Sequence, residues 1–237
     1  MTPRTSFVEW RKSARIVPSR YPPAGVFDRV AAGKDLEAVL AVEGLTNDRL
    51  RNESGEIRLV PEEDRISGVG TTPIMAAFTH PNPDGSRFSD GSFGVYYAGE
   101  SLATAIAESR FHRERFLTYS SEPAIRLQMR TYYARIGGDF HDVRGARKSH
   151  PDWFDPDPAR YGASQALGGA LKAKGSNGLI YRSVRRPAGE CLAVFRPRLV
   201  SPVTQGPHFE YIWDGRSIID VLQIKRYTET GARKSGS

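Results

Sequence analysis

Cysteine is nearly absent from the 237-residue sequence, which contains only Cys191. One cysteine cannot form a disulfide within the chain, and secreted domains of modest size commonly depend on such bonds. The five histidines are scattered, and none stands in the Cys/His or His-x-x-x-His spacing typical of zinc sites. These absences favour a reducing cytoplasm and argue against a structural metal.

Long hydrophobic runs are also missing. The longest stretch without a formal charge, residues 66–83, is broken by glycine and proline and is not the ~20 predominantly apolar residues of a membrane span. The N-terminus reaches Glu9, Arg11 and Lys12 before an apolar run of signal-peptide length develops. We therefore expect a globular cytoplasmic protein that is neither inserted in a membrane nor secreted.

Lysine is scarce although the chain is basic. Of 34 basic residues only 7 are lysine, which leaves 34 − 7 = 27 arginines in a chain of net charge +7. The planar guanidinium suits phosphate and carboxylate groups, but coding from a GC-rich genome produces the same bias. The charge indicates an anionic partner, which could be nucleic acid, a phosphorylated small molecule or an acidic protein.

The chain divides by pattern into three parts. Residues 1–64, with a helix-like stretch over Asp35–Val42, are interpreted as an N-terminal extension packed on the main domain. Residues 65–229 form the main domain. The polar, basic tail 230–237 has the composition of a disordered segment.

Within the main domain, short apolar segments alternate with two helical ones. A strand is predicted over Phe93–Ala98, then a helix capped by Ser101 that runs to about Arg113. Ile125–Thr131 alternates in the period of a half-buried strand. The remaining predicted elements are a helix over Ala163–Lys174 and strands over Leu179–Val184, Cys191–Phe195, Phe209–Trp213 and Ile218–Ile224. This order predicts an α+β fold of mainly antiparallel short strands flanked by helices.

Three residue types that suit nucleotide chemistry stand near one another. Arg87 lies in a turn-rich loop, Tyr96 and Tyr97 lie on the strand that follows, and Glu108 lies at the edge of the apolar face of the next helix. Together they could bind a pyrophosphate, stack a flat base and stabilise a cationic ribosyl transition state. A surface arginine, a core tyrosine and a solvated glutamate without any shared function would give the same sequence pattern.

Ser164 is a weaker candidate. The segment Gly162–Ala166 is similar to a nucleophile elbow but lacks the last glycine and the preceding strand, so serine hydrolysis has little support. Ser164 could cap its helix, the role we expect, or hold a phosphate there. The arginines of Tyr181–Arg186 fit either a nucleic-acid patch or the outward side of a strand.

The segments 85–88, 94–98 and 100–108 together resemble the RES domain, named for its arginine, glutamate and serine. The spacing selects Arg87, Tyr97 and Glu108. Residues 164–168 resemble the serine-bearing segment of the family. Residues 14–16 resemble its opening strand, so the domain could extend back to Arg15, which by this resemblance faces the substrate.

The resemblance implies an ADP-ribosyltransferase-like fold and a bacterial toxin that destroys NAD and is neutralised by an Xre-like antitoxin. NAD is then the substrate, and neither a separate cofactor nor a metal is needed. By the same resemblance Arg87 binds NAD phosphate, Tyr97 positions the nicotinamide riboside, and Glu108 holds the ribose and stabilises its positive charge. Ser164 and Arg15 assist binding.

Other functions fit the sequence as well. ADP-ribose could be transferred to a macromolecule instead of to water or phosphate. The chain could also be a non-catalytic module that binds nucleic acid through its arginines. The identity of the antitoxin and any assembly into a homo-oligomer are left open.

Overall fold

The structure is a computed structural model that describes residues 2–19 and 55–225. Its strands are β1 (Thr5–Pro18), β2 (Tyr96–Gly99), β3 (Ile125–Asp142), β4 (Gly178–Arg182), β5 (Glu190–Val194), β6 (Thr204–Trp213) and β7 (Ile218–Ile224). The helices are α3 (Thr72–Thr79), α4 (Leu102–Tyr119) and α5 (Gly162–Ala173), with short 3-10 turns η2 (Ile57–Leu59), η3 (Glu62–Asp64), η4 (Pro151–Phe154), η5 (Pro158–Arg160) and η6 (Pro197–Leu199). The predicted α+β class with mainly antiparallel strands is confirmed.

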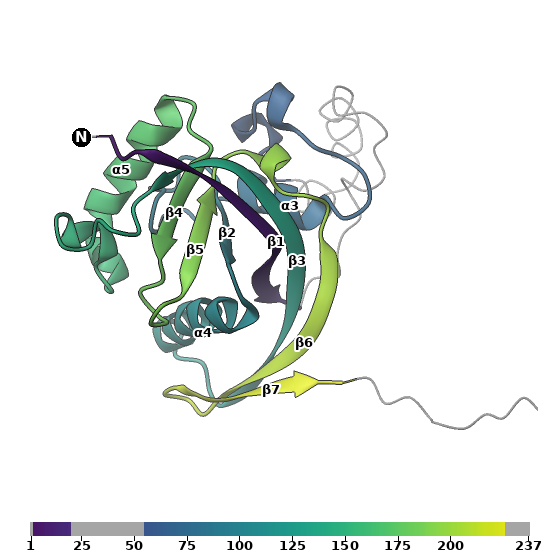
Figure 1. Ribbon diagram of the computed structural model, residues 1–237. Coiled ribbons are helices and arrows are strands. Elements are labelled where there is room, and N and C mark those ends of the chain that lie inside the picture. The colour runs from purple at the N-terminus through teal and green to yellow at the C-terminus, as the bar shows by residue number, and fades with distance from the viewer. Residues whose placement is uncertain (1, 20–54, 226–237) are drawn as a thin grey trace, which may run out of the picture.

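Five of the strands form a closed circuit of pairings. β1 runs antiparallel to β3 over nearly its whole length and also pairs with β2 through Ala14 and Gly99. β2 pairs with β5 and β5 with β4, both antiparallel, while β4 is parallel to the end of β3. β6 and β7 extend the sheet from the other half of β3 (Figure 1).

The hydrophobic core has three parts. The first takes side chains from all five strands of the circuit and from α3, with Ile74 and Tyr96 fully buried. The second lies on β4 and β5 beneath α5 and η4, and the third joins α4 to β3, β6 and β7. Glu108 of α4 therefore lies on a helix that packs against the sheet, near the ends of β4 and β5.

Several predicted strands have different bounds in the structure: β4 and β5 are shifted by one or two residues, and β6 begins at Thr204, before the predicted Phe209. β3 continues to Asp142, well beyond Thr131, although Gly137 and Gly138 interrupt the alternation of side chains. Both glycines remain paired with β1, and Gly138 has a φ of 149°, which favours glycine. β2 runs over Tyr96–Gly99 instead of the predicted Phe93–Ala98, and Gly94, just before it, lies against the backbone of α3 with no room for a side chain.

The N-terminal part contributes directly to the circuit through β1. The predicted helix Asp35–Val42 and the tail 230–237 lie outside the described residues, and the boundary at residue 64 stays a prediction. In the part of the chain that the structure describes, no helix has the length and hydropathy needed to cross a bilayer.

Candidate active site

The start of α4 fixes where its side chains point. Ser101 has extended backbone angles, and its hydroxyl accepts the backbone N–H of Thr104 at 3.2 Å. This is the predicted N-cap, which stabilises the first turn of the helix. It places Glu108 opposite the loop that joins β4 to β5.

The carboxylate of Glu108 is held by two donors from β5 and the β4–β5 loop. The Ser183 hydroxyl donates to Oε1 at 2.6 Å, and the Cys191 thiol donates to the same oxygen at 3.8 Å. The Ser183 oxygen in turn accepts the backbone N–H groups of Arg185 and Arg186 at 3.1 and 3.0 Å. These bonds direct the Ser183 proton toward Glu108. The other carboxylate oxygen, Oε2, forms no hydrogen bond to a described residue.

Tyr97 is a fixed, neutral phenol. Its hydroxyl bonds to the hydroxyl of Ser86 at 2.9 Å and accepts the N–H of Phe88 at 3.0 Å. Burial raises the pKa of Tyr97 to about 12, so the phenol keeps its proton at neutral pH. The two bonds attach the loop on either side of Arg87 to β2.

Arg87 is buried and makes several hydrogen bonds. Its Nη1 donates to the carbonyls of Trp153 and Asp155, both at 3.1 Å, and its Nη2 donates to the Tyr161 hydroxyl at 2.9 Å. The guanidinium carbon lies 4.3 Å from the centre of the Tyr161 ring. Arg87 thus connects the 85–88 loop to the segment before α5.

A second arginine reaches the same phenol. Nη2 of Arg185 donates to the Tyr161 hydroxyl at 3.3 Å and to the carbonyl of Pro156, and its guanidinium lies over the ring of Phe111. The Nε of Arg185 is buried without a hydrogen-bond partner. Among the described residues neither Arg87 nor Arg185 forms an ion pair with a carboxylate. Two cations that share one neutral oxygen favour an anion beside them.

His112 lies one turn after Glu108 on α4. The surrounding protein and the nearby charges of Arg185 and Arg87 lower the pKa of His112 to about 4, although the residue is exposed at the surface. The imidazole is therefore neutral at neutral pH. It adds no positive charge to the two arginines.

Tyr181, on β4, marks the point where the three residues selected by spacing meet. Its pKa is raised by burial and then by the neighbouring Cys191, Glu108 and Tyr97, while Arg87 acts in the opposite direction. The Tyr181 ring lies 5.0 Å from the ring of Phe88, whose N–H bonds to the Tyr97 hydroxyl. Arg87 and Arg185 share the Tyr161 hydroxyl, and the N–H of Arg185 bonds to Ser183, which bonds to Glu108. The structure brings these three residues to one place, on the side of β4 and β5 that α4 and α5 flank.

Ser164 and Arg15 do not reach Glu108. The Ser164 side chain is fully buried, and its hydroxyl donates to the Tyr161 carbonyl at 2.9 Å. Tyr161 is the N-cap residue and makes no side-chain cap bond, so the expectation that Ser164 caps this helix is wrong. Ser164 instead touches the residue that binds both arginines.

Arg15 lies against β2 on the side of the Tyr96 ring. Its guanidinium is 4.8 Å from the centre of that ring, and Nη1 donates to the Tyr97 carbonyl at 2.9 Å. Tyr96 belongs to the core inside the strand circuit, and neighbouring side chains of a strand point to opposite faces. Arg15 therefore supports the backbone of Tyr97 from the face opposite to its phenol.

Sequence reasoning missed Ser183, Arg185 and Cys191. The first two lie inside the stretch 181–186, whose arginines fit either a nucleic-acid patch or the outward side of a strand. In the structure its outer arginines are ion-paired, Arg182 with Glu190 at 3.1 Å and Arg186 with Glu100 at 3.8 Å. The available signal was Ser183, at the end of a predicted strand, followed two residues later by Arg185, which has no acidic residue beside it in sequence.

The described residues offer no metal-binding group at this cluster, and a hollow that they form lies elsewhere on the protein. The described residues contain no group of three His, Cys, Asp or Glu side chains that could hold a metal ion. A hollow of about 330 Å³ shares no lining residue with the cluster; it is lined by Phe7, Glu9, Arg135, Gly137, Arg198, Leu199 and Ser201. The chemistry of the side chains therefore defines the candidate site.

A known family profile covers more than half of the chain. The family profile described as "RES domain" matches residues 63–214, which include Arg87, Tyr97, Glu108 and Ser183. The chain belongs to the RES domain family. This RES protein is also 32% identical over 209 residues to the uncharacterized protein y4oC of Sinorhizobium fredii, covering 86% of this chain and 84% of that protein.

Among solved structures, the RES protein is similar to a chain in the crystal structure of the M. tuberculosis MbcT–MbcA toxin–antitoxin complex. The sequences are 15% identical, the TM-score is 0.45, and the match covers 86% of each chain.

Proposed function

We propose that this RES protein cleaves the bond between nicotinamide and ribose in NAD. The observation that carries the proposal is a carboxylate, Glu108, with one oxygen held by Ser183 and Cys191. Ser183 also accepts the N–H of Arg185, which shares the Tyr161 hydroxyl with Arg87, and neither arginine has an acidic partner among the described residues. A cationic ribosyl group needs the carboxylate, and a diphosphate needs the arginines.

The reaction needs little proton transfer. Nicotinamide is bound to ribose as a cation and leaves as a neutral molecule, taking the electron pair of the C–N bond, so the leaving group needs no general acid. Positive charge then develops on the ribose carbon, where a fixed carboxylate contributes about 3–4 kcal/mol of stabilisation. Water or phosphate supplies the oxygen of the new C–O bond and loses a proton. The second product is ADP-ribose or its 1-phosphate.

Each remaining residue has a proposed role in binding. Arg87 and Arg185, which both bond to Tyr161, bind the diphosphate. Tyr97 positions the nicotinamide riboside with a phenol that its own hydrogen bonds fix. Ser164 acts through Tyr161, and Arg15 acts through the backbone of Tyr97.

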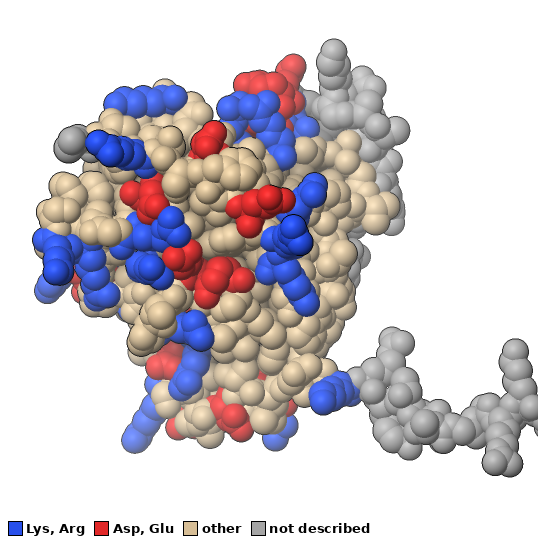
Figure 2. All heavy atoms as spheres, viewed as in Figure 1, with Lys and Arg blue, Asp and Glu red and all other residues tan. Residues whose placement is uncertain are grey.

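A small anion fits this surface better than a long polyanion does. Arg182 and Arg186, the outer arginines of the 181–186 stretch, are neutralised by Glu190 and Glu100. Figure 2 shows acidic and basic side chains alternating over the face in view, without one continuous basic patch. These features support NAD over nucleic acid as the ligand.

The biological role follows from membership of the family. The RES resemblance implies a toxin that depletes cellular NAD, and an Xre-like antitoxin that neutralises it by covering the site. We propose both for this protein. The cognate antitoxin should inhibit the release of nicotinamide at equimolar concentration.

The test is NAD loss by the purified protein, with products identified with and without phosphate. Glu108→Gln should abolish release of nicotinamide while the fold survives. Glu114→Gln is the matched control, because Glu114 lies on the same helix and bonds to the Ile218 N–H and to Arg110 instead. No NAD loss from the wild-type protein refutes the proposal, and label from adenylate-labelled NAD on a macromolecule would indicate transfer instead.

A further inference from the structure

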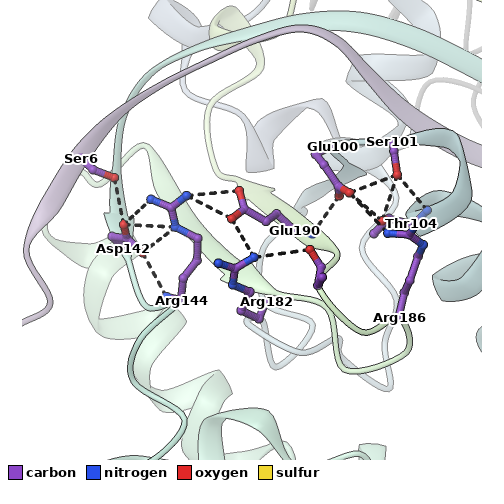
Figure 3. Close-up of polar contacts among 10 residues, drawn as sticks. Ser6, Glu100, Ser101, Thr104, Asp142, Arg144, Arg182, Arg186 and Glu190 are labelled. Atoms are coloured by element: carbon purple, nitrogen blue, oxygen red, sulfur yellow. Dashed lines mark hydrogen bonds and ion pairs between the residues drawn. The ribbon is translucent and has the colours of Figure 1, made fainter.

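Glu100, between β2 and α4, binds two parts of the protein that meet at the candidate site (Figure 3). Its Oε2 accepts the backbone N–H of Glu190 at 2.8 Å, where β5 begins. Its Oε1 accepts the hydroxyls of Ser101 at 3.1 Å and Thr104 at 3.0 Å, in the first turn of α4. Arg186 lies 3.8 Å from the same oxygen.

These contacts join the helix of Glu108 to the loop of Ser183. The loop, residues 183–189, is closed by a bond from the Ser183 N–H to the Gly189 carbonyl at 2.8 Å. Gly189 lies so close to Thr104 that an added Cβ would stand 2.8 Å from its hydroxyl oxygen. The loop therefore rests directly on the first turn of α4, next to the Glu100 carboxylate.

The strand side of this contact is itself braced. The Glu190 carboxylate bonds to Arg144 at 3.2 Å and to Arg182 at 3.1 Å, and Arg144 bonds in turn to Asp142 at 2.6 Å. As Figure 3 shows, these side chains continue from Glu100 across the ends of β5, β4 and β3. Glu100 consequently accepts a hydrogen bond from the Glu190 backbone, whose position is fixed by side-chain contacts across three strands.

We propose that Glu100 is a positioning residue, which holds the 183–189 loop against α4 and so keeps Ser183 within hydrogen-bonding reach of Glu108. This inference rests on the proposed function, because its effect is exerted on the NAD reaction. Glu108 and Ser183 are 75 residues apart in sequence, and Glu100 is bonded to both elements that carry them. It touches none of the reacting atoms.

The decisive experiment is a double-mutant cycle of Glu100→Ala and Ser183→Ala, measured as kcat/KM for release of nicotinamide. Glu100→Ala should lower kcat/KM about tenfold in the wild-type background, the effect of roughly one hydrogen bond to a charged group. In the Ser183→Ala background the same change should cost less than about twofold. Equal losses in both backgrounds would overturn the proposal, since a general structural defect acts independently of Ser183.

Two variants calibrate the cycle. Glu100→Gln keeps an acceptor for the Glu190 N–H and can donate to the two hydroxyls, so it should retain most of the activity. Asp142→Asn weakens the same network at its far end without touching the loop or α4, and activity should stay within about twofold of wild type. Loss of activity in Asp142→Asn equal to that in Glu100→Ala would contradict the assignment to Glu100.

Hydrogen exchange separates this inference from the proposed reaction. Backbone amides of 183–189 should exchange faster in Glu100→Ala than in wild type or Asp142→Asn. Unchanged exchange refutes the tie between Glu100 and the loop. If the wild-type protein releases no nicotinamide, the NAD function fails and the reaction role with it, while exchange still decides whether Glu100 holds the loop.

Discussion

Replacing Ser183 by alanine removes the strongest hydrogen bond to Glu108. The bond is 2.6 Å long, ends on a carboxylate and comes from a serine that is 6% exposed. Hydrogen bonds to charged groups contribute about 1.5–3 kcal/mol, and each ~1.4 kcal/mol of lost transition-state stabilisation lowers a rate tenfold. Because the Cys191 thiol remains as a weak donor at 3.8 Å, we expect kcat to fall about 10–100-fold.

The same substitution should also affect stability. The Ser183 oxygen accepts the N–H groups of Arg185 and Arg186, and leaving buried donors without a partner costs about 1–3 kcal/mol. Unfolding in urea should reveal this loss. Activity must therefore be measured under conditions in which Ser183→Ala is fully folded, as its circular dichroism can confirm.

Ser164→Ala is the matched control for Ser183→Ala. Both serines are buried, but the Ser164 hydroxyl donates to the Tyr161 carbonyl and has no contact with Glu108. Steady-state release of nicotinamide should show a much smaller fall in kcat for Ser164→Ala. The assignment of Ser183 is refuted if folded Ser183→Ala keeps more than about half of the wild-type kcat, or if Ser164→Ala reduces kcat more.

Three further predictions concern other parts of the protein. Arg87→Ala should raise KM for NAD about tenfold or more and destabilise the fold, because its guanidinium also bonds to Trp153, Asp155 and Tyr161; unchanged KM would exclude the phosphate role. An unfolded histidine binds a proton below pH 6.5 but His112 only below about 4, so stability should fall as pH drops between these values. His112→Gln should reduce that fall in urea titrations at pH 7 and 5, and an equal fall would contradict the lowered pKa. Asp64→Ala should cost about 1–3 kcal/mol in urea unfolding without changing turnover, because the buried carboxylate bonds to Arg196 and Arg198 at 2.9 and 3.1 Å; a stability loss below about 0.5 kcal/mol would show that these bonds are not needed.

Local features of the fold were predictable because neighbouring residues determine them. The Ser101 cap and the helix after it, the hairpin strands β6 and β7, and the alternation at the start of β3 all appear in the structure. The second half of β3 was not predictable from the sequence, since Gly137 and Gly138 are residues that usually end or interrupt a strand. Pairing with β1, more than a hundred residues earlier in sequence, and with β4 at its end keeps that segment extended.

The same distinction applies to the site. Arg87, Tyr97 and Glu108 lie in one short stretch, so their spacing was visible, and hydrogen bonds through Phe88, Tyr161, Arg185 and Ser183 link them in the structure. Ser183 and Arg185 come from a loop whose distance from Glu108 depends on the pairing of β2 with β5. A sequence pattern carries no measure of such a distance, and the serine that the family resemblance indicates is Ser164, which bonds to Tyr161 and not to Glu108.

The closed circuit of strands has a consequence for how the protein is made. β1 is synthesised first, but its partners begin only at Tyr96 and Ile125, and the circuit closes only when β5 is complete at Val194. Contacts this distant in sequence form slowly and cannot form on a partial chain. Ser183 and Cys191 also arrive late. A nascent chain should therefore have no activity until Val194 has left the ribosome, so that activity begins in one step, after all five strands of the circuit have been made.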